Sequence, residues 1–257
     1  MERHIYLCED SAEGIFSAIY KAYEDRYGHG NNEIRIEGNE FNRELFCEYH
    51  RVETDYDRAV KVARTICREI SEAAYDFVHR AACSWQSEKA DAIYHFIQEG
   101  LRVGERAMNH LTAPHMQTLY AIDRNITNEI HAFKEFLRFE ELENGVLFGR
   151  INPKSAVLPY LADHFEDRFS GEKWVIADTV HRTVLIHGVN RHTIYAAMTE
   201  ADLEELMLHY SAEEKEWQKL WKVFVDTIAI KERVNRNLQR QMLPLHFRKF
   251  MKEFSDR

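Results

Sequence analysis

The stretch between residues 115 and 148 constrains the fold most, because a helical pattern ends there and a strand pattern begins. Apolar residues recur at every third or fourth position from Leu119 to Leu137, which predicts a helix over 115–139 with one buried face. Asn144-Gly145 then predicts a hairpin with a type I′ turn between two short apolar runs. We therefore expect an α+β fold, with small antiparallel sheets packed against a predominantly helical array.

The rest of the chain shows the same two patterns in succession. We expect a β-α-β-β unit over residues 1–53, helices over 54–114, a helix-hairpin-helix-strand unit over 115–198, and C-terminal helices over 199–257. Asp10 or Ser11 can cap the first helix, Gly38-Asn39 is expected to be a turn, and Pro159 predicts a helix break. Because no repeat or low-complexity linker separates these segments, we expect one large domain over residues 1–257.

The charge is unevenly distributed. The chain carries a net charge of -9, and eight Lys/Arg against three acids give the stretch from Lys231 onward +5, which leaves -14 for the remainder. A net negative charge is the opposite of what a protein that coats long nucleic acid usually shows. The basic tail could contact phosphate or an acidic partner, although two solvated terminal helices would give the same pattern.

The cysteines and the hydropathy pattern indicate the compartment. The four cysteines, at positions 8, 47, 67 and 83, form no C-x-x-C pair, so we expect free thiols in a reducing environment. The sequence has no run of about 18 apolar residues, so no transmembrane helix is predicted. The first residues lack the apolar core of a signal peptide. We expect a cytoplasmic protein without membrane contact.

A first group of candidate site residues lies on the helix expected after Pro159. His164, Asp167 and Arg168 are spaced so that they share one helical face. A histidine beside a carboxylate and a guanidinium could shuttle a proton or clamp an anion. An ordinary surface ion pair beside a partly buried histidine would give the same pattern.

Two further groups flank the first one in the sequence. His131 and Arg138 are seven residues apart and can share a face of the long helix. Asp178 and Arg182 bracket a turn between two apolar strands, where they either form local turn bonds or enter a pocket. The hypothesis is that His131, His164 and Asp167 are catalytic, and that Arg138, Arg168, Asp178 and Arg182 bind a nucleotide or phosphate.

The last third of the chain supplies the remaining candidates. Arg233, Asn237 and Arg240 are three or four residues apart, so we expect them on one helical face that could hold a phosphate. Trp217 and Trp221 belong to an apolar stripe that is typical of core packing rather than of base stacking.

Motifs for cofactors and metals are not found. Glu129 and His131 are two apart and do not face one another on a straight helix, and His187 and His192 would need further carboxylates to hold a metal. The phosphate-binding loops G-x-x-x-x-G-K-[ST] and G-x-G-x-x-G, the nucleophile elbow G-x-S-x-G and the zinc-deaminase signature are all missing from the sequence. We expect neither a metal nor a cofactor.

Several short motifs, in a specific order, carry a resemblance to a known family. They are Glu9-Asp10-Ser11 with Gly14-Ile15, Glu129-x-His131 with Phe136-Leu137-Arg138-Phe139, Asn144-Gly145-Val146-Leu147, His164-Phe165-x-Asp167-Arg168, Trp174-x-Ile176-x-Asp178 with Arg182, Leu220-Trp221, Ile228-x-Ile230-x-x-Arg233-x-Asn235 and Gln241-Met242-x-Pro244. The chain resembles a bacterial family of DNA-metabolism or DNA-repair proteins whose activity is not established.

The resemblance implies partners rather than a reaction. Members of that family are typically encoded beside a radical-SAM protein that itself looks like a DNA-repair enzyme, and a related domain is fused to some uracil-DNA glycosylase-like proteins. The resemblance therefore implies a radical-SAM partner, and DNA or a nucleotide as ligand. This chain has His181 where the family usually has an acid before the arginine of the Asp178 turn. It carries no glycosylase domain, so base excision is not expected of it.

Three hypotheses about function stay open on the sequence. The first, which we favour, is an accessory protein in DNA repair or nucleic-acid modification that binds nucleotide, DNA or a radical-SAM partner. The second is an enzyme acting on nucleotides or nucleic acid, with His131 or His164 as acid or base and three arginines on phosphate. The third is a protein-binding scaffold without nucleic-acid contact, which the net charge of -9 favours. Whether the chain is an enzyme is left open.

Overall fold

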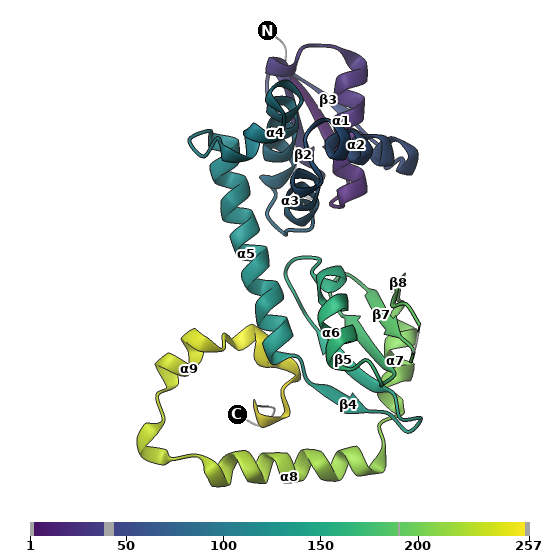
Figure 1. Ribbon diagram of the computed structural model, residues 1–257, viewed down its shortest axis with the longest axis vertical. Helices are drawn as coiled ribbons and strands as arrows, with labels where there is room; N and C mark the ends of the chain where they lie inside the picture. The colour runs from purple at the N-terminus through teal and green to yellow at the C-terminus, as the bar shows by residue number, and fades with distance from the viewer. Residues whose placement is uncertain (1–2, 39–43, 190, 255–257) are drawn as a thin grey trace. The chain divides into compact units, whose positions relative to one another are not determined.

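The computed structural model describes residues 3–38, 44–189 and 191–254 (Figure 1). The chain divides into two compact units, Met1–Thr127 and Asn128–Arg257, each described by itself below. The α+β class expected from the sequence is confirmed. The single domain stays a prediction. No helix of the described part is long and apolar enough to cross a bilayer.

The first unit opens with the expected β-α-β-β order. Its strands are β1 (Arg3–Cys8), β2 (Asn32–Ile36) and β3 (Cys47–Arg51), in the order β2-β1-β3, and the helix α1 (Ala12–Asp25) and the short 3-10 turn η1 (His29–Asn31) connect β1 to β2. Both strand pairs are parallel, so the expectation of an antiparallel sheet is wrong here. The helical crossover brings the chain back in its original direction, and this makes β2 parallel to β1. The turn expected at Gly38-Asn39 includes Asn39, which lies outside the described residues.

The start of α1 follows from three residues. The Ser11 side chain accepts a hydrogen bond from the Gly14 N–H at 3.0 Å, so Ser11 rather than Asp10 is the cap. A Cβ atom on Gly14 would lie 2.6 Å from the Glu9 carbonyl oxygen, and only glycine avoids that clash. The helix therefore starts at a defined point directly after β1.

Helices cover the sheet of the first unit. They are α2 (Tyr56–Glu69), α3 (Glu72–Ala82), α4 (Lys89–Val103), the 3-10 segment η2 (Gly104–Asn109) and the first half of α5 (Pro114–Phe136). Asp55 and Ser71 cap α2 and α3. Tyr6, Phe96 and Ile66, all fully buried, belong to one continuous core. Residues 54–114, where helices were expected, contain α2, α3, α4 and η2.

The second unit is built on a mixed five-stranded sheet. Its strands are β4 (Phe139–Glu141), β5 (Leu147–Ile151), β6 (Trp174–Asp178), β7 (Thr183–His187) and β8 (Ile194–Ala197), in sequential order across the sheet. Only β5 and β6 are parallel, because the 3-10 turn η3 (Leu158–Leu161) and α6 (Ala162–Arg168) form a crossover between them. The remaining pairs are antiparallel, as expected. The break predicted at Pro159 coincides with η3.

The hairpin at Asn144-Gly145 forms, but not with the predicted turn type. Gly145 has a φ of 75°, whereas Asn144 is not among the residues with positive φ. The Gly145 N–H donates to the Leu142 carbonyl and the Leu142 N–H to the Val146 carbonyl, each at 2.9 Å. A type I′ turn requires positive φ at both central residues, so this turn is instead a longer loop closed by a single left-handed glycine.

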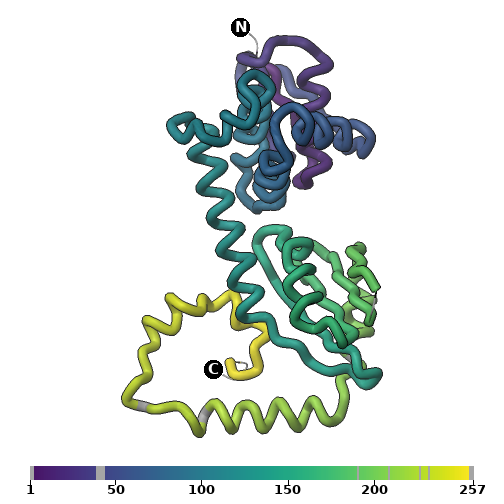
Figure 2. Tube along the Cα trace, viewed as in Figure 1, coloured from purple at the N-terminus to yellow at the C-terminus, as the bar shows by residue number. Residues whose placement is uncertain are grey.

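The C-terminal helices follow the sheet. They are α7 (Glu200–Leu208), α8 (Ala212–Ile228) and α9 (Arg236–Met242), with 3-10 turns η4 (Lys231–Arg233), η5 (Leu245–Phe250) and η6 (Lys252–Phe254). The chain returns to the end of α5, as the tube in Figure 2 shows. Phe247 packs edge-on against Phe133 at 4.9 Å, and Lys252 pairs with the buried Glu140 at 2.5 Å. These contacts hold the segment after α9 against α5 and β4.

Candidate functional site

The carboxylate of Asp178 closes the turn between β6 and β7. It is fully buried, and its Oδ1 accepts the N–H groups of Val180 at 2.9 Å and of His181 at 3.0 Å. Its Oδ2 lies 2.7 Å from the His181 Nδ1. Arg182 has a φ of 54°, is exposed, and lies 3.7 Å from the Glu200 carboxylate. Asp178 therefore organises the turn, and Arg182 points to the surface.

His164 is the partly buried member of the group on α6. Its Nε2 is buried without a hydrogen-bond partner among the described residues, and its ring lies edge-on to Phe165 at 4.9 Å. Burial lowers the pKa of His164, and the positive charges of Lys134 and Arg168 lower it further. Asp167, which opposes this effect, and Arg168 are both exposed. This arrangement favours a neutral imidazole, which could accept or donate one hydrogen bond.

The lowered pKa of His164 makes stability depend on pH. Below the ordinary histidine pKa of about 6.5, the unfolded chain binds a proton at His164 more readily than the folded chain does. The free energy of unfolding therefore decreases as the pH is lowered. We expect His164→Gln to flatten that fall between about pH 7 and pH 5 in urea unfolding curves. His131→Gln controls for the loss of one exposed histidine. If the free energy of unfolding changes equally with pH in wild type and His164→Gln, the pKa of His164 is not lowered in the folded protein.

The two candidates on or after α5 have different surroundings. His131 is exposed on the helix. The Arg138 guanidinium donates to the carbonyl groups of the three residues before it, at 3.2–3.5 Å, and to the Glu253 carboxylate at 3.2 Å. Arg138 thus caps the end of α5 and holds η6 against it. On the same helix, the Glu129 carboxylate accepts the N–H of Lys154 at 2.6 Å. This bond anchors the loop between β5 and η3 to α5.

A cluster that sequence reasoning missed joins α6 to the sheet. The rings of Trp174 and His187, directly opposite in the β6–β7 register, stack with centroids 5.0 Å apart. His187 Nδ1 lies 3.0 Å from the Thr193 hydroxyl, and the Glu166 carboxylate accepts the Thr193 N–H at 3.2 Å. Within the described part, Trp174 Nε1 and His187 Nε2 are buried without partners. The sequence placed Trp174 and His187 on neighbouring strands, but it did not give the register that sets the two side chains opposite each other.

The apolar face of α8 is exposed, which corrects the expectation of a core stripe. Trp217 is 66% exposed, Trp221 45% and Phe224 51%. The rings of Trp221 and Phe224 lie 5.7 Å apart, next to each other on one side of the helix. The periodicity correctly predicted an amphipathic helix, but among the described residues this face is largely uncovered.

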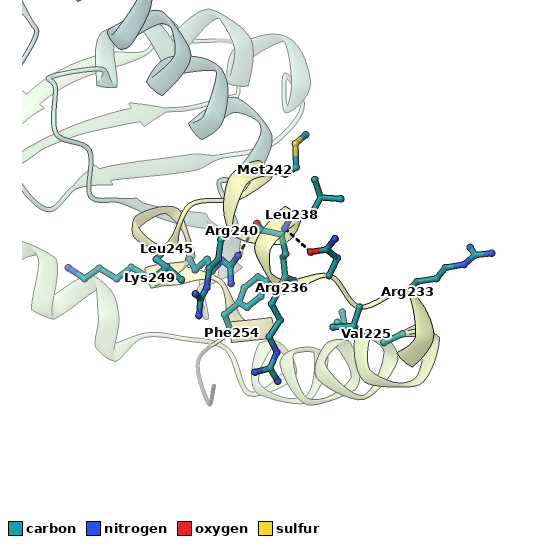
Figure 3. Close-up of a pocket in the computed structure, with 14 residues that line it drawn as sticks. Val225, Arg233, Arg236, Leu238, Arg240, Met242, Leu245, Lys249 and Phe254 are labelled. Carbon is teal, nitrogen blue, oxygen red and sulfur yellow. Dashed lines mark hydrogen bonds between the residues drawn. The ribbon is translucent and has the colours of Figure 1, made fainter.

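A basic hollow lies beside α8. It has a volume of about 1460 Å³ and lies between the end of α8, α9 and the turns after α9 (Figure 3). Arg233 and Lys249 point outward on opposite sides, with Arg236 and Arg240 between them (Figure 3). Arg233 belongs to η4 and Arg240 to α9, so the single helical face expected for them is wrong. Asn235, two residues after the end of η4, caps α9 and accepts a hydrogen bond from the Leu238 N–H at 3.0 Å.

One further cation of the hollow has a structural role. Arg248 donates to the carbonyl groups of Leu243 at 2.8 and 3.0 Å and of Gln239 at 3.0 Å, and its guanidinium lies 4.6 Å from the centre of the Phe254 ring. It closes the end of α9. By contrast, the side chains of Arg233, Arg236 and Arg240 are exposed.

The candidate residues therefore fall into separate local groups. Asp178 closes a turn, Arg138 caps a helix, and His164 is half-buried on α6. The contacts of Asp178 and Arg138 are those of a structural role. Within the described part of the second unit, the basic hollow and the exposed face of α8 are surface features that lack a structural explanation.

Comparison with known proteins identifies a family for most of the chain. The family model of a domain of unknown function, DUF4130, matches residues 87–253, from just before α4 to the end of the described C-terminal turns. A solved structure described as a member of a family of ribosomal proteins, with a DHH domain, shares 9% identity over 74% of each chain, with a TM-score of 0.30. So low a TM-score carries no argument. Comparison with curated proteins finds no match.

Proposed function

This chain belongs to the DUF4130 family, and we propose that it is an accessory protein in DNA repair or nucleic-acid modification. In this proposal the basic hollow binds the phosphate backbone of nucleic acid, and the exposed face of α8 binds a partner protein. The resemblance described above points to a radical-SAM protein as that partner.

The observation that carries the proposal is the spacing of exposed cations around the basic hollow. Arg233 and Lys249 point outward on opposite sides, with Arg236 and Arg240 between them (Figure 3). A site for one phosphate would need its donors to converge on one point. Cations that diverge along an open surface suit several successive phosphates of an extended strand. The local charge of +5 from Lys231 onward favours such a ligand despite the net charge of -9.

The face of α8 supports the second half of the proposal. Trp217, Trp221 and Phe224 are large, exposed and close together on one helix. Contiguous exposed aromatic residues mark interaction surfaces, and tryptophan is enriched among the residues that dominate binding. An amphipathic helix of this kind can lie in an apolar groove of a partner.

A scaffold without nucleic-acid contact is the second candidate. The face of α8 would serve it equally well, and the net charge of -9 favours it. The enzyme hypothesis receives less support, because Asp178 and Arg138 are engaged in local structure and His131 is exposed.

Replacing three arginines tests the nucleic-acid half. We expect Arg233→Gln/Arg236→Gln/Arg240→Gln to weaken binding of a fluorescein-labelled single-stranded oligonucleotide by about 10- to 100-fold, since an exposed ionic contact contributes up to about 1 kcal/mol. Fluorescence anisotropy at low salt measures the affinity. The variant should fold normally, because all three side chains are exposed.

The matched control removes the same number of exposed arginines elsewhere. Arg64→Gln/Arg68→Gln/Arg106→Gln changes the net charge equally but leaves the basic hollow intact. It should bind the oligonucleotide as wild type does. If both triple variants lose the same affinity for the oligonucleotide, or if wild type does not bind it, the basic hollow is not a nucleic-acid site. The hypothesis of a protein-binding scaffold would then remain.

A further inference from the structure

Two histidines and a glutamate converge on the sheet of the first unit, outside the residues that the family model matches. His4 lies on β1, and Glu48 and His50 lie on β3. In the parallel register His4 pairs with Glu48, and Tyr6 pairs with His50. Side chains at alternate positions of a strand share a face, and paired residues of neighbouring strands do too. All four side chains therefore belong to one face of the sheet.

The possible ligand atoms are close enough to share one ion. His4 Nδ1 lies 3.2 Å from His50 Nε2 and 3.3 Å from the Glu48 carboxylate. The remaining distance, from His50 Nε2 to the Glu48 carboxylate, is 3.9 Å. Two ligands at about 2.0–2.1 Å from a tetrahedral zinc ion are about 3.3–3.4 Å apart. Two of the three distances match this spacing, and a rotation of Glu48, whose side chain is 51% exposed, would shorten the third.

The surroundings hold the two imidazoles in place. Tyr27 stacks on the His4 ring with centroids 3.8 Å apart, and Tyr6 stacks on the His50 ring at 4.9 Å. The Tyr6 hydroxyl donates to the Asp25 carboxylate at 3.1 Å. Rings packed in this way are fixed before any ion binds, as ligands of a metal site usually are. The half-exposed Glu48 side chain leaves that side of the group accessible to an ion from solvent.

A second histidine-glutamate group of the same unit shows what a purely ionic arrangement looks like. The buried Glu99 takes His110 on one carboxylate oxygen at 2.5 Å and His115 on the other at 2.9 Å. There the carboxylate lies between the imidazoles, and each imidazole pairs with its own carboxylate oxygen. At His4 and His50 the two nitrogens instead face each other directly. Among the described residues, His4, Glu48 and His50 are the one group whose ligand atoms all lie within 4.8 Å of one another.

We propose that His4, Glu48 and His50 bind a divalent transition-metal ion, with Zn²⁺ as the ion that fits the spacing. Two imidazole nitrogens and one carboxylate oxygen are ordinary zinc ligands, and three protein ligands leave a fourth position for water or a small ligand. The sequence alone does not indicate this site, because His4 is separated from both partners by more than 40 positions, about the length of the whole β-α-β-β unit.

Zinc titration of the chelator-stripped full chain tests the proposal. Calorimetry should show one Zn²⁺ bound per chain. His50→Ala should weaken binding by more than about 100-fold, since even residues around a metal ligand change affinity by about 10- to 100-fold. Glu48→Gln should weaken it by at least about 10-fold. Binding should also weaken as the pH falls, because protons compete with the metal ion for the ligand atoms.

The controls test whether zinc binds at this group rather than elsewhere on the chain. His95→Gln removes a histidine that pairs with Asp91 on α4, and it should bind zinc as wild type does. Circular dichroism checks that each variant is folded, and the exposed Glu48 makes Glu48→Gln informative even if His50→Ala unfolds. Visible absorption of the Co²⁺ form should be weaker in Glu48→Gln than in wild type at the same Co²⁺ concentration. Failure to bind Zn²⁺, unchanged binding by Glu48→Gln, or a sulfur-to-cobalt charge-transfer band would overturn the proposal.

Discussion

Replacing Trp217 and Trp221 with alanine should abolish partner binding without unfolding the protein. Each side chain is about half exposed or more, so we expect the free energy of unfolding to change by no more than about 0.5 kcal/mol. Exposed tryptophans at the centre of an interface contribute about 2–4 kcal/mol each, so loss of both should weaken binding of the radical-SAM protein that we propose as partner by about 1000-fold or more. Urea unfolding and a pull-down with that partner measure the two effects.

Trp85→Ala is the matched control for the tryptophan variant. Trp85 is 55% exposed and lies in the first unit, away from α8 in the sequence. It should bind the partner as wild type does. If the Trp217→Ala/Trp221→Ala variant instead loses about 3–5 kcal/mol of stability per residue, the face of α8 is buried in the folded protein and is not a docking surface.

Asp178→Ala should cause a large loss of stability. The substitution leaves the N–H groups of Val180 and His181 without their acceptor and removes the carboxylate beside the His181 imidazole. Each buried N–H group that is left without its acceptor costs about 1–3 kcal/mol. Chemical denaturation followed by circular dichroism measures the change.

Asp178→Asn separates the hydrogen bonds from the charge. The amide keeps an oxygen that can accept the two backbone N–H groups, so this variant should be less destabilised than Asp178→Ala. If Asp178→Ala is as stable as wild type, the carboxylate does not organise the turn. In that case a binding role for Asp178, as the sequence suggests, would regain support.

Local patterns predicted the elements of this fold well. The stripe from Leu119 to Leu137 corresponds to α5, and the strands that contain Trp174 and Val184 form at the two apolar runs on either side of the Asp178 turn. These elements depend on neighbours that are close in sequence, which is why periodicity detects them. The hairpin at Asn144-Gly145 shows the limit of local reasoning. Its turn type depends on how β4 and β5 pair, and the pairing extends beyond the two turn residues.

Placement over longer distances was not predictable from the sequence. An apolar stripe on α8 shows that the helix has two faces, but not whether another element covers the apolar one. The parallel pairing of β1 and β3 brings His4 beside His50, and no local pattern sets that register. Arg138 had the spacing of a ligand-binding residue, yet its position at the end of α5 makes it a helix cap.

The salt dependence of DNA binding tests the central claim most directly, because it counts the phosphate contacts that we propose for the basic hollow. Each contact with a single strand contributes about 0.7 to the slope of log affinity against log salt concentration. Loss of three contacts in Arg233→Gln/Arg236→Gln/Arg240→Gln should therefore reduce the slope by about 2, while Arg64→Gln/Arg68→Gln/Arg106→Gln should keep the wild-type slope. A slope that is the same in wild type and in the basic-hollow variant would contradict the account.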